Sequence, residues 1–169
     1  SGVREMSLIA TPPVDRLAVR TYVSPFDLMT LREALLRERF RGGQTFFVVP
    51  RVSDLEEAGA FLQEHVPELR VARAHGQMSS SELDDVMNAF YDRQYDVLLS
   101  TTIVESGLDI PNANTIFIDD ADRYGLADLH QLRGRVGRYK HRAYCYLLVG
   151  EDRHLSPEAA RRLRAIEEF

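Results

Sequence analysis

The chain has 169 residues, a hydrophobic fraction of 44% and a charged fraction of 28%, which are the values of a soluble globular domain. Its net charge of −5 argues against a domain that holds nucleic acid mainly through a basic face, although a local basic cluster such as residues 133–142 stays open. No apolar run approaches the ~18 residues needed to span a bilayer, and no signal-peptide pattern opens the chain. We therefore expect a cytoplasmic location and no membrane partner.

Two residue types exclude further classes of site. Lysine occurs once, at Lys140, between Tyr139 and His141. The chain therefore has no Gly-Lys-Ser/Thr sequence and does not bind ATP as a P-loop protein by itself. The lone Cys145 lies in an apolar run, where core packing is its expected role. The scattered histidines have no second cysteine to complete a zinc pattern, so we expect no metal site.

The first part of the chain predicts a lead-in followed by a helix. Residues 1–23 form the lead-in, because Thr11-Pro12-Pro13 interrupts regular backbone hydrogen bonding. Ser24-Pro25-Phe26-Asp27 is typical of a helix start, with the serine as the N-cap and the proline in the first turn. Gly42-Gly43 is expected to end this helix.

Capping signals predict where the later helices begin, and apolar runs predict the strands. Ser53 and Ser79 each precede a glutamate by three residues, which is the capping-box spacing, and Ser156 precedes a proline at a terminal helix. The expected strands are rich in β-branched and aromatic residues. They cover residues 17–23, 45–49, 70–74, 96–100, 115–118 and 143–149.

Strands that alternate with helices through short polar joins predict an α/β fold of three layers with a mostly parallel sheet. In such sheets ligands bind at the carboxyl ends of the strands. His75-Gly76, Thr101-Thr102 and Asp119-Asp120 fall at those ends. The sequence therefore predicts a functional edge built from the loops that follow three different strands.

The terminal helix carries Leu163, Ile166 and Phe169 without an obvious partner surface. We expect these side chains to form an exposed apolar patch that favours self-association. The chain stops after them without a turn signal, so we expect it to be part of a longer protein.

Two segments are the strongest candidates for function. Residues 100–112 place hydroxyls and a glycine at the exit of a buried strand, where backbone amides can meet a phosphate. Residues 130–138 contain Arg133, Arg135 and Arg138, a spacing that would aim three guanidinium groups at one anionic ligand. Neither segment has a nucleophile beside a base, so phosphate chemistry is favoured over acyl transfer.

These segments resemble the second motor lobe of superfamily 2 helicases, and residues 131–138 look like the last motif of that family. Residues 44–53, 75–78 and 101–111 match its other motifs. Within the superfamily, residues 7–16 and 101–112 are most similar to the transcription-repair coupling factor type, with RecG-like fork helicases next.

The resemblance implies a RecA-like, P-loop NTPase-like lobe at 24–150. It would lie between an inter-lobe lead-in at 1–23 and the start of a C-terminal helical extension at 151–169. The resemblance further implies a motor that uses ATP and Mg²⁺, held mainly by a first RecA-like lobe of the same chain. Double-stranded DNA would be its track. RNA polymerase and excision-repair proteins would be partners through other domains.

The resemblance implies ATP-binding or catalytic roles for individual residues of this sequence. Arg138 or Arg135 would act as the arginine finger, which stabilises the negative charge of the phosphoryl-transfer transition state. Gln131 would also reach the ATP. Gly107 and Asp109 match the segment that links the nucleotide cleft to the DNA track.

Residues that would serve DNA are transferred in the same way. Thr101 and Thr102 match hydroxyls that hold a DNA phosphate, and the His75-Gly76 turn matches a loop near the same backbone. Contacts of this kind to phosphate do not depend on base sequence, as a motor requires. They also suit a lobe whose net charge is negative.

Structural alternatives stay open for single residues. Asp109 could only cap the turn before Pro111, His75 could be a packed turn residue, and the arginine run could be a solvated helix terminus. Asp119-Asp120 follows a later strand and is not the metal-binding acidic box of the first lobe.

Alternatives also stay open for the whole chain. They are a lobe of a RecG-like fork-reversal helicase and a catalytically silent docking module. A dinucleotide-binding domain is excluded because no Gly-x-Gly-x-x-Gly follows the first strand. Because Walker A and Walker B sequences are absent, we expect the chain to be inactive alone.

Overall fold

The computed structural model describes residues 19–101, 113–137, 142–150 and 154–168. Within these residues a six-stranded sheet runs in the order β1-β6-β5-β2-β4-β3, and every neighbouring pair is parallel. The strands are β1 (Val19–Pro25), β2 (Gln44–Val49), β3 (Val71–Ala74), β4 (Val97–Thr101), β5 (Ala113–Ile118) and β6 (Ala143–Val149). The helices are α2 (Leu28–Phe40), α3 (Val52–His65), α4 (Ser80–Tyr91), the 3₁₀ turn η1 (Ala121–Arg123), α5 (Leu126–Arg133) and α6 (Pro157–Glu168).

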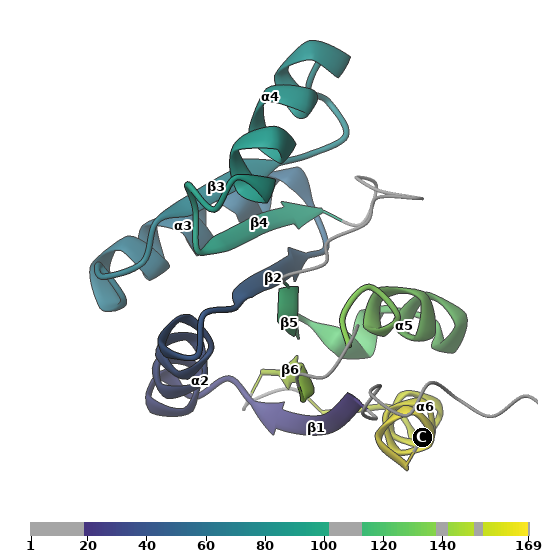
Figure 1. Cartoon of the computed structure of the whole chain (residues 1–169). Helices are drawn as coiled ribbons and strands as arrows, with labels where there is room; N and C mark the ends of the chain where they lie inside the picture. The colour runs from purple at the N-terminus through teal and green to yellow at the C-terminus, as the bar shows by residue number, and fades with distance from the viewer. Residues whose placement is uncertain (1–18, 102–112, 138–141, 151–153, 169) are drawn as a thin grey trace, which may run out of the picture.

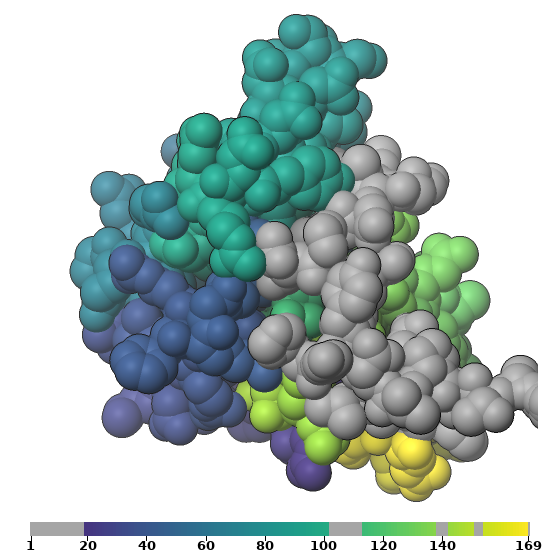
Figure 2. Space-filling model, in the orientation of Figure 1, coloured from purple at the N-terminus to yellow at the C-terminus, as the bar shows by residue number. Residues whose placement is uncertain are grey.

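Helices cover both faces of the sheet, so the fold has the three layers that the sequence predicts. α2 and α3 cover one face, and α4, α5 and α6 cover the other (Figure 1). In the space-filling view the residues of α4 stand out from the rest of the body (Figure 2). The predicted α/β class with a parallel sheet is confirmed.

Alternation along each strand divides the core between the two faces. In β2, which is buried throughout, Phe46 joins the core beneath α4 and α5, and Phe47 joins the core beneath α2 and α3. Aromatic rings also stack across four neighbouring strands. The centroid distances are 5.5 Å for Tyr22–Tyr146, 4.8 Å for Tyr146–Phe117 and 5.5 Å for Phe117–Phe47. These contacts tie the edge strand β1 to the centre of the sheet.

The start of α2 differs from the prediction. Ser24 and Pro25 belong to β1, where they pair with Leu148 and Val149 of β6, and the N-cap of α2 is Asp27. Its carboxylate accepts a hydrogen bond from the Thr30 backbone N–H at 3.1 Å. A proline fits here because it ends an edge strand, where a missing N–H costs little. Sheet pairing therefore outweighs a local helix signal.

The other predicted helix starts are partly confirmed. Ser79 caps α4, and its capping box with Glu82 has both hydrogen bonds at 3.1 Å. Ser156 accepts a hydrogen bond from the Ala159 N–H at 3.1 Å and begins α6. The expected cap at Ser53 is wrong, because Arg51 occupies the N-cap position of α3 and its backbone N–H donates to Asp54.

The expected apolar patch on α6 is also wrong for two of its residues. Leu163 is 2% exposed and Ile166 is fully buried, because α6 packs against β1, η1 and α5. The Val23 N–H donates to Glu167 Oε2 at 2.9 Å and so ties α6 to the edge strand. Phe169 lies outside the described residues.

The expected division into residues 1–23, 24–150 and 151–169 stays a prediction. In the structure, β1 crosses the first boundary, and both β1 and α6 pack on the same core as the rest of the sheet.

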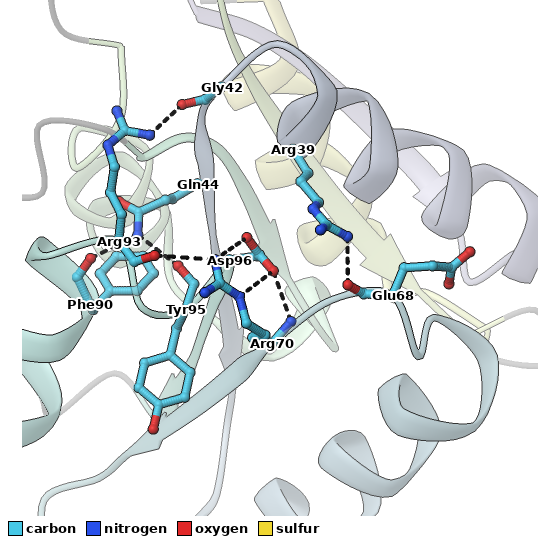
Figure 3. Close-up of polar contacts among 9 residues, drawn as sticks. All are labelled: Arg39, Gly42, Gln44, Glu68, Arg70, Phe90, Arg93, Tyr95 and Asp96. Carbon is cyan, nitrogen blue, oxygen red and sulfur yellow. Dashed lines mark hydrogen bonds and ion pairs between the residues drawn. The ribbon is translucent and has the colours of Figure 1, made fainter.

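Side chains fix the loops at the amino ends of the strands. The Gln44 amide nitrogen donates to the carbonyl oxygens of Phe90 and Tyr95, both at 2.8 Å (Figure 3). The carboxylate of Asp96 accepts from the Arg70 backbone N–H at 2.8 Å and from the Arg70 guanidinium at 3.2 Å. These hydrogen bonds hold the loops that lead into β2, β3 and β4. In parallel sheets ligands bind at the opposite, carboxyl edge.

Candidate functional site

The carboxyl ends of the strands form one edge, and three predicted segments meet it. His75 and Gly76 follow β3, Thr101 ends β4, and Asp119 follows β5. Because β3, β4, β2 and β5 are consecutive neighbours in the sheet, these loops lie in a row along the edge. The topology thus brings them together as expected for a parallel sheet.

Thr101 is 3% exposed, and its hydroxyl is among the buried polar groups without a hydrogen-bond partner. Its register partner is Val49 at the end of β2. A buried hydroxyl without a partner costs about 1–3 kcal/mol, so such groups persist mainly where they have a task. Thr102, Gly107 and Asp109 lie outside the described residues, and their expected roles stay predictions.

The conformation of the His75-Gly76 turn is fixed by a hydrogen bond within it and by the capping box that follows. The His75 side chain is half-buried, and its Nδ1 accepts a hydrogen bond from the Gln77 N–H at 3.1 Å. The capping box of α4 then fixes the following residues, and its hydrogen bonds from Ser79 lower the pKa of Glu82. Gly76 is exposed and leaves the backbone open to a ligand. His75 thus stabilises the turn, as the structural alternative expects, and its expected DNA-binding role stays a prediction.

The arginine segment begins at the C-terminal end of α5. Leu129 and Leu132 anchor this helix in the core, Gln131 faces outward, and Arg135 is half-buried in the turn that follows. The Arg135 N–H donates to the Leu132 carbonyl at 3.1 Å, which fixes the direction of the turn. Arg138 lies outside the described residues, so its position relative to Arg135 stays a prediction.

Arg133 has hydrogen-bond partners within the fold, which does not fit the expectation that its guanidinium group converges with two others on one ligand. Its Nη1 donates to the Ile166 carbonyl at 2.7 Å and to Thr21 Oγ1 at 3.2 Å. Arg133 therefore joins α5 to α6 and β1 and has a structural task.

Position 137, at the end of this segment, requires glycine for two physical reasons. Its φ of +90° lies in the left-handed region, and a Cβ built on it would lie 2.7 Å from Val19 Cγ2 and 3.3 Å from Ala143 Cβ. The turn thus needs a residue without a side chain at the point where it meets β1 and β6.

Gly137→Ala should destabilise the domain by about 1–3 kcal/mol, because backbone strain and a steric clash add. Gly134→Ala is the matched control, since Gly134 has αR backbone angles and its nearest contact would be 3.3 Å. Urea unfolding followed by circular dichroism measures both midpoints. Equal midpoints for the two variants would show that the Gly137 conformation can relax at no cost.

The sequence did not reveal a pocket of about 440 Å³ on the α3 side of the same edge. Phe26, Phe47 and Phe61 line it together with the carboxylates of Asp119 and Glu57. Burial and the neighbouring Asp120 carboxylate raise the pKa of Asp119 to about 6. Adjacent aspartates at a strand end were the only available signal, because the aromatic walls come from three separate segments.

Within the described residues no group of three or more His, Cys, Asp and Glu side chains is placed to hold a metal ion. Cys145 is fully buried and its pKa is raised to about 12 by that burial, which agrees with a packing role. Among the helices described, none has the length and apolar character needed to cross a membrane.

A parallel sheet covered by helices on both faces, with a polar carboxyl edge and an arginine turn, defines a RecA-like α/β domain. The chain belongs to the helicase conserved C-terminal domain family, whose model matches residues 28–140. The resemblance of the sequence to helicases is thereby confirmed.

Curated relatives extend the match over nearly the whole chain. The transcription-repair-coupling factor of Rickettsia typhi is 52% identical over 167 residues, which are 99% of this chain and 15% of that protein. The protein of the same name from Escherichia coli K12 is 52% identical over 166 residues, which are 98% of this chain and 14% of that protein. The chain thus spans about 15% of the length of these two relatives.

Solved structures agree with this fold. RecG bound to a three-way DNA junction is 41% identical with a TM-score of 0.78, covering 92% of this chain and 21% of the RecG chain. The C-terminal domain of the DEAD-box protein Dbp5 has a TM-score of 0.64 at 18% identity, covering 92% of this chain and 86% of that domain. At 18% identity, the similarity to Dbp5 supports the fold alone.

Proposed function

We propose that this chain is the second motor lobe of an ATP-dependent double-stranded DNA translocase of the transcription-repair coupling factor type. The observation that carries the proposal is 52% identity to coupling factors over 99% of the chain. Displacement of stalled RNA polymerase and recruitment of excision-repair proteins would belong to the full-length protein and its other domains.

In this proposal ATP lies between a first RecA-like lobe and the face that carries Gln131, Arg135 and Arg138. The first lobe supplies the P-loop and the Mg²⁺ site, since this sequence has no Gly-Lys-Ser/Thr. The half-buried Arg135 and the fixed turn after α5 support the arrangement, because a finger must hold its guanidinium group without rearrangement. Gly107 and Asp109 would connect this face to the DNA track.

DNA would run along the carboxyl edge. Thr101 and Thr102 would hold a backbone phosphate through their hydroxyls, and the His75-Gly76 turn would contact the same backbone. The unpartnered hydroxyl of Thr101 supports this role, as does the exposed Gly76 backbone. Opening and closing of the cleft during hydrolysis would then carry the DNA one step relative to the first lobe.

A RecG-like fork helicase is the second candidate, favoured by 41% identity to RecG and a TM-score of 0.78. Two assays of the full-length protein separate the candidates. A coupling factor should turn over ATP with linear duplex DNA and release RNA polymerase stalled on a template. A RecG-like enzyme should instead regress a model fork and leave the stalled polymerase in place.

ATP turnover also tests whether the protein is a motor at all. We expect duplex DNA to stimulate hydrolysis by the full-length protein and the isolated chain to hydrolyse nothing. A full-length protein that binds DNA without any stimulated hydrolysis would contradict the motor proposal and support the docking module.

A further inference from the structure

The pocket of about 440 Å³ on the α3 side of the carboxyl edge has the size of a small-molecule site, since such sites have volumes of about 300–1,000 Å³. None of its lining residues is among those to which the proposed motor function assigns ATP or DNA. Its walls come from β2, from α3 with its N-cap, and from the residues that follow β1, β5 and β6. We call this cavity the α3 pocket.

Three phenylalanine rings form the apolar part of the α3 pocket. Phe26 and Phe61 pack edge to face with ring centroids 5.2 Å apart, and Phe47 belongs to the core against which both rings pack. The Phe26 backbone N–H donates to the Val149 carbonyl at 3.1 Å, which fixes its backbone beside the end of β6. Phe26 and Phe61 are half-buried, so each ring keeps accessible surface. The face of such a ring carries negative charge and attracts cations.

Two carboxylates in the α3 pocket, those of Asp119 and Glu57, form no ion pair with any residue that the structure describes. The other two acidic side chains of the lining have cationic partners. Asp54 pairs with Arg51 at 3.1 Å, and Asp120 contacts an arginine of η1 at 3.7 Å. Arg51 is the one cation among the described lining residues. The pocket therefore carries negative charge that its own cation does not balance.

Aromatic rings beside unpaired carboxylates form the kind of site that recognises organic cations. We propose that the α3 pocket binds an organic cation, with an ammonium, amidinium or guanidinium group at Asp119 and Glu57 and an apolar body against the phenylalanine rings. A metal ion does not fit, because no group of three or more His, Cys, Asp and Glu side chains in the described part of the chain is placed to hold one. A phosphate ligand does not fit either, because the carboxylates would repel it.

Three ligands of one shape and different charge test the proposal. Near neutral pH benzamidine is a cation, benzamide is neutral and benzoate is an anion. Each is titrated into the isotopically labelled chain, and amide NMR shifts are followed. We expect benzamidine to give saturable shifts at Phe47, Asp119 and Gly150 with a Kd of about 1 mM or tighter, and the other two ligands to bind at least about tenfold more weakly. Absence of saturable shifts with benzamidine, or equal binding of benzamide, would overturn the proposal.

Variants place the cation at the carboxylates. Asp119→Asn keeps the shape of the side chain and should weaken benzamidine by about tenfold, and Glu57→Gln should weaken it less because Glu57 is exposed. Glu56→Gln is the matched control, since Glu56 is the exposed neighbour of Glu57 on α3 and does not line the pocket. The control should bind benzamidine as the unchanged chain does. Equal affinities of Asp119→Asn and Glu56→Gln would overturn the proposal.

The affinity should also depend on pH in the direction that Asp119 sets. Burial and the Asp120 carboxylate raise the pKa of Asp119 to about 6. The carboxyl group is therefore ionised near pH 7.5 and mostly protonated near pH 5, so benzamidine should bind about tenfold more weakly at the lower pH. The charged and titratable groups around it are Asp120, Asp54, Glu57, Arg51 and Tyr124. Asp119→Asn should lose most of the pH dependence, and a pH-independent affinity of the unchanged chain would overturn the assignment of the cation to Asp119.

A blocked arginine amide identifies the source of the cation. Tighter binding of this compound than of benzamidine would assign the α3 pocket to an arginine side chain of a protein, and tighter binding of benzamidine would assign it to a free small molecule. Both results keep the cation site. Because these measurements need neither ATP, DNA nor a first lobe, their outcome is independent of the proposed motor function.

Discussion

Arg138→Ala in the full-length protein should lower DNA-stimulated ATP turnover by about 10³-fold or more while ATP binding is retained. The phosphoryl-transfer transition state spreads negative charge over three oxygens, and an arginine fork neutralises that charge where it develops. Arg138→Lys should recover little, because a lysine presents a single point charge in place of the planar fork. Steady-state turnover and nucleotide binding measured separately distinguish a loss in kcat from a loss in affinity.

Arg123→Ala is the control for this experiment. Arg123 is a half-exposed arginine in η1, and it contacts the Asp120 carboxylate at 3.7 Å. Its removal should leave turnover close to that of the unchanged protein, since surface ion pairs contribute little. If Arg138→Ala behaved like Arg123→Ala, the finger would be reassigned to Arg135, and Arg135→Ala would then be the variant that loses turnover.

The strands were predictable because their information is local. A run such as residues 45–49 is apolar at every position, which a strand buried on both faces requires, and β2 covers 44–49. The capping box at Ser79 and Glu82 was predictable for the same reason, since both partners lie within one turn. Local signals of this kind determine most of the element order and hence the fold class.

The errors arose where a distant segment decides the outcome. Ser24-Pro25 has a local helix-start pattern, but pairing with β6 holds both residues in a strand. Leu163 and Ile166 looked exposed because their partners in β1 and α5 lie far away in the sequence. Neither partner can be found from the spacing of residues within one element.

In the candidate site, too, features with a local signal were predictable and features that depend on distant segments were not. The residue types at Thr101, His75 and Arg135 were readable from motifs, and the parallel sheet explains why the loops of Thr101 and His75 share an edge. The separate task of Arg133 was not readable, because it depends on a carbonyl of α6 that the arginine reaches across the fold. A sequence motif therefore identifies the residues of a site, but it does not show which of them contact the ligand and which support the fold.

The second large effect is expected at Glu38, a charged residue buried inside the fold. Its carboxylate accepts hydrogen bonds from Arg41 Nε at 2.8 Å and Arg41 Nη2 at 2.7 Å, and the Thr115 hydroxyl also donates to it. Gly43 leaves the space that the carboxylate occupies, since a Cβ there would lie 2.0 Å from Glu38 Oε2. The network joins the end of α2 to β5 at the amino edge.

Glu38→Ala should destabilise the domain by about 2–4 kcal/mol, because it leaves the buried Thr115 hydroxyl without its acceptor and takes the carboxylate from Arg41, whose side chain is 26% exposed and still donates to the Arg142 carbonyl. The midpoint of urea unfolding measures this loss. Glu33→Ala is the matched control, since Glu33 lies on the same helix with its side chain 76% exposed and pairs with Arg37 at 3.2 Å. Its effect should be small.

The double variant Glu38→Ala with Arg41→Ala tests whether the cost comes from the unpaired charge. If it does, the double change should cost clearly less than the sum of the two single changes, because the second substitution removes the group that the first left unpaired. Arg41 also lies 5.2 Å above the Tyr144 ring, so its own removal still loses some packing. Additive costs would mean that Glu38 acts through packing alone, and a Glu38→Ala midpoint equal to that of Glu33→Ala would contradict the network as a source of stability.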